Sequence, residues 1–193
     1  MSRILTIAIP TYNRAHHVGR LIDQLIKHRV TELAEILVID DGGGDNTYEQ
    51  LISRIASYQD SISIHRNETN LGYPQTLVRL FLKCRTKYLL AIADDDNLIT
   101  ESVKPLLEFL ASEKPDFVSP QFIANCSIYR GKAENRKIRP SEFHECCRHA
   151  PGLVYNVPRC NIGLGLLARR IRENTTDALV YPCLLYTSDA ADE

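Results

Sequence analysis

The chain has 193 residues, of which 44% are hydrophobic and 24% are charged, and its formal net charge is −1. This composition is typical of one globular domain with an apolar core, and the near-neutral charge argues against nucleic acid as a partner, because phosphate binding normally requires a basic surface. Six irregularly spaced cysteines indicate reduced thiols in a cytoplasmic protein, and no apolar stretch reaches the roughly 18 residues of a membrane span.

The first strand and helix are predicted close to the N-terminus. Ile4 to Ile9 is a run of β-branched and apolar residues, as expected for a strand buried within a parallel sheet. We expect Pro10 to end this strand, because proline cannot extend the hydrogen-bond ladder. An amphipathic helix should follow a short turn, with Asn13 as its N-cap. Its apolar stripe consists of Val18, Leu21, Ile22, Leu25 and Ile26.

The same order repeats in the next segment. Glu35 to Asp40 predicts a second buried strand, which ends in an acidic, glycine-rich turn at 40–45. A second helix is expected from Asn46, with Glu49 as its partner in a capping box. The apolar stripe of this helix consists of Tyr48, Leu51, Ile52 and Ile55.

Two further strand and helix pairs complete the pattern. Alternating residues at 61–65 predict a third strand with one less-buried face, and Pro74 suits the first turn of a third helix. Tyr88 to Ala93 predicts a fourth strand, a fourth helix should begin near Ser102, and 117–119 is a short fifth strand. The inward residues of the third helix are Leu77, Val78, Leu80, Phe81 and Cys84, and those of the fourth are Val103, Leu106, Leu107 and Leu110.

Strands that alternate with helices in this way predict an α/β sandwich with a mainly parallel central sheet and helices on both faces. In such sheets, ligands bind in the crevice beyond the carboxyl ends of the strands. Three polar loops follow strands here: Pro10 to Arg14, Asp40 to Asp45 and Asp94 to Asn97. We therefore expect these three loops to share one site.

The triplet Asp94-Asp95-Asp96 comes directly after an apolar run. Adjacent carboxylates repel one another, so their clustering at a strand end favours a counter-charge, most economically a divalent cation with oxygen ligands. The alternative is an acidic turn that is simply solvated. The second acidic turn, at 40–45, favours the cation, since both turns should face the same crevice.

The other two loops also allow alternative readings. Asp41 can accept a hydrogen bond from a base N–H or a ribose hydroxyl, or it can simply form a turn before a helix. Tyr12 can stack on a nucleobase or pack within its loop, and Arg14 can meet a phosphate or point into solvent. For Asp41 we favour the ligand, because it faces the same side as the acidic triplet.

At these loops the sequence resembles the family 2 glycosyltransferases, which have the Rossmann-like GT-A fold. The matching segments occur in the family's order and spacing within about residues 3–120: Ile7 to Arg14, Val38 to Gly42, Asn70 to Gly72, and Asp94 to Asp96. The resemblance implies that the nucleotide sugar is bound by Pro10, Thr11, Tyr12, Arg14, Asp41, Asp94 and Asp95. It also implies that Asp96, within a DXD motif, holds Mg²⁺ or Mn²⁺ against the diphosphate. Gly43 stands where the family often has Ser, and the contact at Asp41 need not suffer.

The chemistry that the resemblance implies is a metal-dependent, inverting transfer. An acceptor hydroxyl attacks the anomeric carbon while the nucleoside diphosphate leaves. Such enzymes usually supply a general base from an acidic pair well after the metal motif. Between Pro151 and Pro182 the acids are Glu173 and Asp177, and neither stands in that context. We therefore expect the base beyond Pro182, and little or no transfer by this chain.

The family further implies a nucleoside-diphosphate sugar as donor and a saccharide or lipid-linked acceptor, in surface-polysaccharide or glycolipid synthesis. A basic loop at 131–139 weakly indicates peripheral contact with the inner face of a membrane; its cations are Lys132, Arg136, Lys137 and Arg139. The cluster His144 to His149 holds four possible zinc ligands, but adjacent cysteines cannot easily serve one tetrahedral ion. Ser141 to Cys147 is expected to form a short helix.

We divide the chain into a transferase domain at 1–182 and a tail at 183–193. The domain comprises a donor-binding part, 1–120, and an incomplete acceptor part, 121–182. The tail resembles a translated sequencing adapter, so we expect the natural chain to continue differently after about Pro182; a natural C-terminus is the alternative.

Two other classes of α/β protein compete with this interpretation. A phosphorylatable receiver-type signalling module also clusters carboxylates around Mg²⁺, but it needs paired acids after the first strand, where this chain has Pro10-Thr11-Tyr12. A nucleotidyltransferase that makes the sugar donor would require a glycine-rich, basic phosphate loop at the same place. Metal-dependent binding of nucleoside diphosphates would support the transferase, and labelling by a small phosphodonor would support the receiver.

Overall fold

The computed structural model describes residues 3–120, 122–124, 127–129 and 152–173. Several predictions lie outside these described residues: the basic loop 131–139, the helix 141–147, the His144 to His149 cluster, Asp177 and the tail 183–193. The division at residue 182 likewise stays a prediction.

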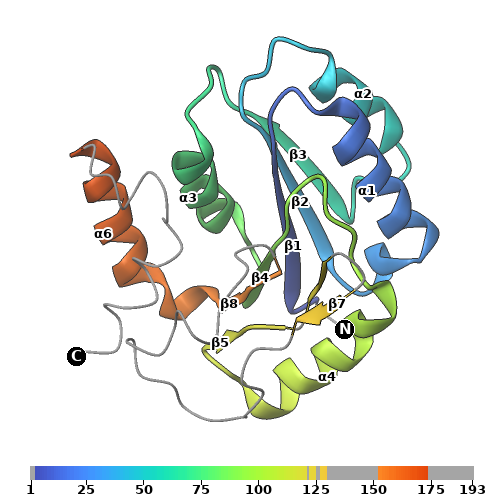
Figure 1. The fold of residues 1–193 in the computed structure, drawn as a ribbon, viewed down its shortest axis with the longest axis vertical. Coiled ribbons are helices and arrows are strands. Elements are labelled where there is room, and N and C mark those ends of the chain that lie inside the picture. Colours follow the sequence, from blue (N-terminus) through green and yellow to red (C-terminus); the bar gives the residue numbers. More distant parts are fainter. Residues whose placement is uncertain (1–2, 121, 125–126, 130–151, 174–193) are drawn as a thin grey trace.

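A six-stranded sheet forms the centre of the molecule, in the order β3-β2-β1-β4-β8-β5 (Figure 1). The first four of these strands run parallel, whereas β8 is antiparallel to both of its neighbours. The strands are β1 (Leu5–Thr11), β2 (Glu35–Asp40), β3 (Ile62–Arg66), β4 (Tyr88–Ala91), β5 (Phe117–Val118) and β8 (Val154–Asn156). A separate pair consists of β6 (Phe122–Ala124) and β7 (Ser127–Tyr129). The mainly parallel α/β sheet is thus confirmed.

Helices cover both faces of this sheet. One face carries α1 (Ala15–Lys27), α2 (Thr47–Arg54) and α4 (Val103–Glu113), and the other carries α3 (Tyr73–Lys83) and α6 (Asn161–Arg172). Short 3₁₀ turns, η1 (Val30–Glu32), η2 (Thr100–Ser102) and η4 (Val157–Arg159), link some of them. No helix of the described segments is both long and apolar enough to cross a bilayer.

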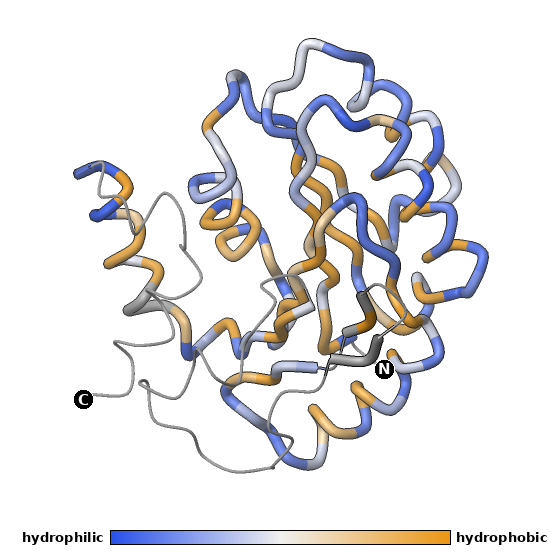
Figure 2. Tube along the Cα trace, in the orientation of Figure 1, coloured by the Kyte–Doolittle hydropathy of each residue, from blue (hydrophilic) through white to orange (hydrophobic). Residues whose placement is uncertain are grey.

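A hydrophobic core lies on each face of the sheet, which explains why the sequences of the central strands are nearly continuous apolar runs. Along β1, Ile7 and Ile9 pack toward α1 and α2, and Ala8 packs toward α3 on the opposite face. A strand that is buried on both faces is apolar at most positions, and the polar exceptions in β1, Thr6 and Thr11, are buried with hydrogen-bond partners. Figure 2 shows the result: the strands at the centre are hydrophobic, and the loops at their ends are hydrophilic.

Two local predictions about the first strand and the first helix are wrong. Pro10 does not end β1, since the ladder with β2 continues to Thr11 and only the pairing with β4 stops at Ala8. Asn13 does not cap α1: it has a φ of 53°, a left-handed conformation that asparagine tolerates, and its Oδ1 accepts from the Asp45 N–H at 3.3 Å. The loop after β1 is therefore tied to the loop after β2.

The second helix begins where it is expected, with Asn46 directly before Thr47, but it differs from its prediction in its capping and along its stripe. Asn46 makes no capping bond; instead the carboxylate of Asp45 accepts from Thr47 N–H at 3.1 Å and from its hydroxyl at 2.8 Å. Glu49, the expected partner in a capping box, pairs with Arg66. Ile52 is exposed, because only Leu51 and Ile55 of the expected stripe reach the core, with Tyr48 half-buried.

Candidate functional site

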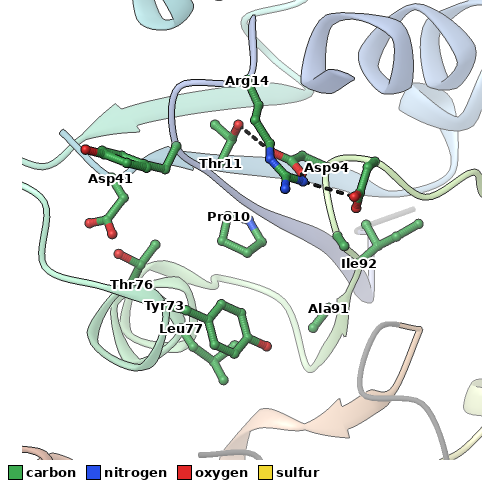
Figure 3. A pocket seen from close by; sticks show the side chains of 13 residues that line it. Pro10, Thr11, Arg14, Asp41, Tyr73, Thr76, Leu77, Ala91, Ile92 and Asp94 are labelled. Carbon is green, nitrogen blue, oxygen red and sulfur yellow. Dashed lines mark hydrogen bonds and ion pairs between the residues drawn. The ribbon is translucent and has the colours of Figure 1, made fainter. Parts of the chain in front are cut away.

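A cavity of about 490 Å³ opens at the carboxyl ends of β1, β2 and β4, against the first turns of α3 (Figure 3). In Figure 3, Asp41 lies on one side of Pro10 and Asp94 on the other. The lining residues are Pro10, Thr11, Tyr12, Arg14, Asp41, Tyr73, Thr76, Leu77, Ala91, Ile92, Ala93, Asp94 and Asp95. The three loops that follow the strands therefore do meet at one site.

All seven residues that the sequence predicts to bind a nucleotide sugar line this cavity, whereas Asp96 is not among the lining residues. Asp96 is partly buried in the turn after β4, where its N–H donates to the Ala93 carbonyl at 3.2 Å. The prediction misses Tyr73, Thr76 and Leu77. A signal for them was present: Pro74 predicts the first turn of a helix, and the residues of that turn could have been expected near the crevice at the strand ends.

The acidic end of the cavity is held by positive charge from the first loop. Arg14 Nη1 lies 3.0 Å from Asp94 Oδ1 and 3.0 Å from Asp95 Oδ2, and Thr11 Oγ1 donates to Asp94 Oδ2 at 2.7 Å. The hydrogen bond to Asp94 and the charges of both carboxylates raise the pKa of Arg14 above its ordinary value. Asp94 is buried, while the side chains of Arg14 and Asp95 are about half-exposed, at 49% and 50%. Solvent can therefore reach this ion pair.

Polar side chains spaced four residues apart, from α1 and from His28 directly after it, hold the segment that follows Asp94. The pairs are Arg20 Nη2 to the Asp95 carbonyl (3.0 Å), Gln24 Nε2 to the Leu98 carbonyl (3.0 Å), the Leu98 N–H to Gln24 Oε1 (3.3 Å), and His28 Nδ1 with Thr100 Oγ1 (3.1 Å). Residues four apart share one face of a helix, so α1 supports this segment along its length.

At the opposite end, Asp41 is 5% exposed and its carboxylate accepts three hydrogen bonds. Oδ1 accepts from Asn67 Nδ2 at 2.6 Å and from the Leu71 N–H at 3.0 Å, and Oδ2 accepts from the Gly72 N–H at 2.9 Å. The backbone of Asp41 also donates to the Thr11 carbonyl at 2.8 Å. Asp41 therefore organises the loop 70–72 and joins it to the end of β1.

Two glycines allow these loops to pack together. Gly42 has a φ of 71°, and a Cβ there would overlap the carbonyl carbon of Thr69. Gly72, at the start of α3, has a φ of 81° and places its N–H against Asp41. Both conformations are unfavourable for residues with a Cβ.

Asp40, next to Asp41, points into the protein instead. Its side chain is fully buried, and burial raises the pKa of its carboxyl group, while the Gly43 N–H at 3.3 Å and Arg66 at 3.4 Å counteract part of this effect. Its Oδ2 accepts no hydrogen bond. Adjacent side chains of a strand point to opposite faces, so of the two aspartates only Asp41 reaches the cavity.

The donor set at the acidic end suits a hard divalent cation in part. Carboxylate oxygens are the ligands that Mg²⁺ prefers, but it usually takes only one or two from the protein and completes its shell with water and phosphate oxygens. Over the described residues, no three His, Cys, Asp or Glu side chains gather as a closed metal site. Asp94 and Asp95 therefore fit an ion that a phosphate ligand would help to bind.

Comparison with known proteins points to one family. The profile of the family described as glycosyl transferase family 2 matches residues 6–176. The abequosyltransferase RfbV of Salmonella typhimurium is 24% identical over 126 residues, which cover 65% of this chain and 38% of that protein. The chain spans about two fifths of the length of the curated relatives it matches.

Solved structures with the same fold include a protein named as a mannosyltransferase. Residues 1–349 of Staphylococcus aureus TarS in complex with UDP match with a TM-score of 0.69 at 15% identity, covering 97% of this chain and 54% of that one. The mannosyltransferase PcManGT of Pyrobaculum calidifontis, in complex with GDP-Man and Mn²⁺, matches with a TM-score of 0.62 at 15% identity, covering 84% and 47%. These likenesses confirm the expected GT-A architecture.

Proposed function

The chain belongs to glycosyl transferase family 2, and we propose that its cavity binds a nucleoside-diphosphate sugar whose sugar is transferred to an acceptor hydroxyl. The observation that carries this proposal is the meeting of three strand-end loops around one 490 Å³ cavity with a carboxylate at each end. Family membership also decides against the receiver-type module.

In this proposal the nucleoside occupies the Asp41 end. Three donors already bind the carboxylate of Asp41, two at Oδ1 and one at Oδ2. Oδ2 therefore retains a lone pair that can accept from a base N–H or a ribose hydroxyl. Tyr12 and Tyr73 line the same cavity and are 43% and 45% exposed, so each offers an aromatic face for stacking.

The diphosphate occupies the other end, beside Asp94 and Asp95. We assign Asp94, Asp95 and Asp96 as the residues that would hold Mg²⁺ or Mn²⁺; when bound, the ion would supply positive charge to the leaving diphosphate. Mn²⁺ in the complex of PcManGT supports this assignment. Arg14 forms ion pairs with Asp94 and Asp95 in the free chain and would turn toward a phosphate oxygen in the complex.

The transfer we propose is a single displacement with inversion, in which the acceptor hydroxyl attacks the anomeric carbon as the nucleoside diphosphate leaves. Its general base is expected beyond Pro182. Glu173 does not line the cavity; it is exposed at the end of α6 and lies 3.5 Å from Arg169.

A saccharide or lipid-linked acceptor, in surface-polysaccharide or glycolipid synthesis at the cytoplasmic side of a membrane, completes the proposal. The family match and the relative named an abequosyltransferase support a saccharide product. Residues beyond the matched two fifths of such proteins would supply much of the acceptor site.

Calorimetric titration with UDP and GDP, each with and without Mn²⁺, tests the proposal. We expect one of the two nucleotides to bind, and to bind at least about tenfold more weakly without the metal or in the Asp95→Asn variant. Asp60→Asn, which makes the same chemical change at an exposed site outside the cavity, should bind as the unaltered chain does. Absence of any binding, or equal binding by Asp95→Asn, would contradict the proposal.

A further inference from the structure

Asn67, directly after β3, connects Asp41 to α3 through its side chain. It is 3% exposed, and its Nδ2 donates to Asp41 Oδ1 at 2.6 Å and to Thr76 Oγ1 at 3.0 Å. Its Oδ1 accepts from Arg79 Nη1 at 2.7 Å. Both hydrogens of the amide nitrogen and one lone pair of the amide oxygen are thus in use.

The partners of Asn67 determine which way its amide group points. Arginine has only donors, so the oxygen of Asn67 must face Arg79 and the nitrogen must face Asp41. A flipped amide would set its oxygen against the Asp41 carboxylate and its NH₂ against the guanidinium. Two unfavourable contacts would then replace two hydrogen bonds. Arg79, although it does not line the cavity, thereby fixes a donor that points at Asp41.

We propose that Asn67 is a positioning residue for the nucleotide end of the cavity, and that it transmits the orientation set by Arg79 on α3 to Asp41 and Thr76. Both of these residues line the cavity, and Figure 3 shows them side by side. With Asn67 in place, Asp41 Oδ1 faces away from the ligand and Oδ2 is left to contact it. The inference rests on the proposed function only for what Asp41 binds; the positioning is a property of the free chain.

The variant Asn67→Asp separates positioning from packing, because it keeps the shape of the side chain. It sets a second carboxylate against Asp41, where the native amide donates. Two carboxylates in contact cannot both be ionised without a large cost, so they share a proton at acidic pH and repel each other at alkaline pH. The order of the loop 70–72, whose N–H groups bind Asp41, should therefore become dependent on pH in this variant alone.

The charges that surround Asn67 are common to the native chain and the variant, so they cannot account for a pH dependence that appears in the variant alone. Arg79 on α3 donates to Asn67 Oδ1, and Arg66 lies at the end of β3. Asp40, at the end of β2, faces Arg66 Nε at 3.4 Å, and Glu49 of α2 faces Arg66 Nη1 at 2.9 Å. These groups are the same in the native chain and in the variant.

Hydrogen exchange of the Leu71 and Gly72 amides, measured by NMR at about pH 5.5 and about pH 8, tests the proposal. After correction for intrinsic rates, we expect Asn67→Asp to lose about tenfold in protection between the two pH values, the equivalent of one pKa unit of interaction. The native chain should keep its protection, and so should Asn46→Asp, which adds the same charge at an exposed position. Equal protection in all three proteins at both pH values would overturn the proposal.

Arg79→Met provides a second test should the first variant not fold. It removes the donor that orients the amide and leaves Asp41 and Asn67 untouched. Protection of the Leu71 and Gly72 amides should fall at both pH values, and Arg79→Lys should restore part of it, since lysine can still donate to Asn67 Oδ1. Native protection in Arg79→Met would overturn the proposal.

Titration with UDP and GDP in the presence of Mn²⁺ extends the test to a ligand. Weaker binding by Asn67→Asp at about pH 8 that recovers at about pH 5.5 would support positioning of the nucleotide end. Binding by this variant that does not change with pH, when the native chain binds, would contradict it. A native chain that binds neither nucleotide would overturn the proposed function, and the amide exchange would then decide on Asn67 alone.

Discussion

The two ends of the cavity are built in different ways. At one end, Asp41 is nearly inaccessible to solvent and is held by two backbone N–H groups and an amide, all of them neutral donors. At the other, Asp94 is equally buried and also accepts from Thr11, but it shares with the half-exposed Asp95 the cation of Arg14, whose side chain is half-exposed. Neutral buried donors fix a geometry, whereas an exposed ion pair is weak and can exchange its partner. We infer that the first end is rigid before a ligand arrives and that the second rearranges when one binds.

The largest effect should follow from Asp41→Asn, which alters the rigid end. The variant would turn an NH₂ group toward donors that now face a carboxylate, and unpaired buried donors cost about 3 kcal/mol of unfolding free energy. Nucleotide binding should fall by at least about a hundredfold, which chemical denaturation and calorimetry would measure together. A variant with native stability and native affinity would show that this end is not organised by Asp41.

Gly42→Ala should disturb the same end somewhat less. A methyl group at Gly42 would overlap Thr69, and the φ of 71° disfavours any residue with a Cβ, so we expect a loss of about 2 kcal/mol in unfolding free energy. Gly44→Ala is the matched control, because a Cβ there has no atom within 4 Å; it should change stability by less than about 0.5 kcal/mol. Similar losses in the two variants would argue against close packing of the two loops.

At the end of the cavity that carries Asp94 and Asp95, Arg14→Gln should strengthen the binding of a cation. Removal of the arginine leaves Asp94 and Asp95 without their positive partner, so the free chain should bind Mn²⁺ about fivefold more tightly, as expected from an exposed ion pair. Paramagnetic broadening by Mn²⁺ would measure this without any transfer reaction. Weaker binding of Mn²⁺ by the variant would contradict an exchange between Arg14 and the metal.

The smallest effect concerns Asp40, the buried neighbour of Asp41. Burial raises the pKa of Asp40 in the folded chain, so folding favours the protonated form of this side chain. The free energy of unfolding should therefore fall as pH rises from about 4, the ordinary pKa of aspartate, through the raised pKa. Asp40→Asn removes this titration. The stability of the variant relative to the native chain should therefore increase with pH across that window, as thermal unfolding at several pH values would show. If the stability of the variant relative to the native chain fell with pH instead, the effects of Arg66 and Gly43 on the pKa of Asp40 would outweigh that of burial.

Much of this molecule was predictable from local pattern. The apolar runs at 4–9, 35–40 and 88–93 and the helical stripes predict the parallel sheet and its covering helices, because each depends on residues close in sequence. The cavity-lining positions after each strand followed from the rule that ligands bind at carboxyl ends. Pro10, Thr11, Tyr12, Asp41 and Asp94 all lie where that rule places them.

The remaining features depend on contacts between distant segments. Strand β8 has only three residues and becomes a strand by inserting between β4 and β5, more than thirty residues away in sequence. Asn13 gives up its expected capping role to bind the backbone of Asp45. Asn67 reads as an ordinary turn residue until Asp41, Thr76 and Arg79 are brought around it. No local pattern predicts such a choice of partner.

The most direct test of a cavity with two distinct ends is to divide the ligand. The nucleotide that binds best would be compared with its nucleoside and with pyrophosphate, in the presence of Mn²⁺, on the native chain, Asp41→Asn and Asp95→Asn. We predict that Asp41→Asn weakens the nucleoside and spares pyrophosphate, that Asp95→Asn does the reverse, and that the nucleoside diphosphate is weakened by both. Two variants that weaken both fragments equally, or neither fragment, would contradict the account.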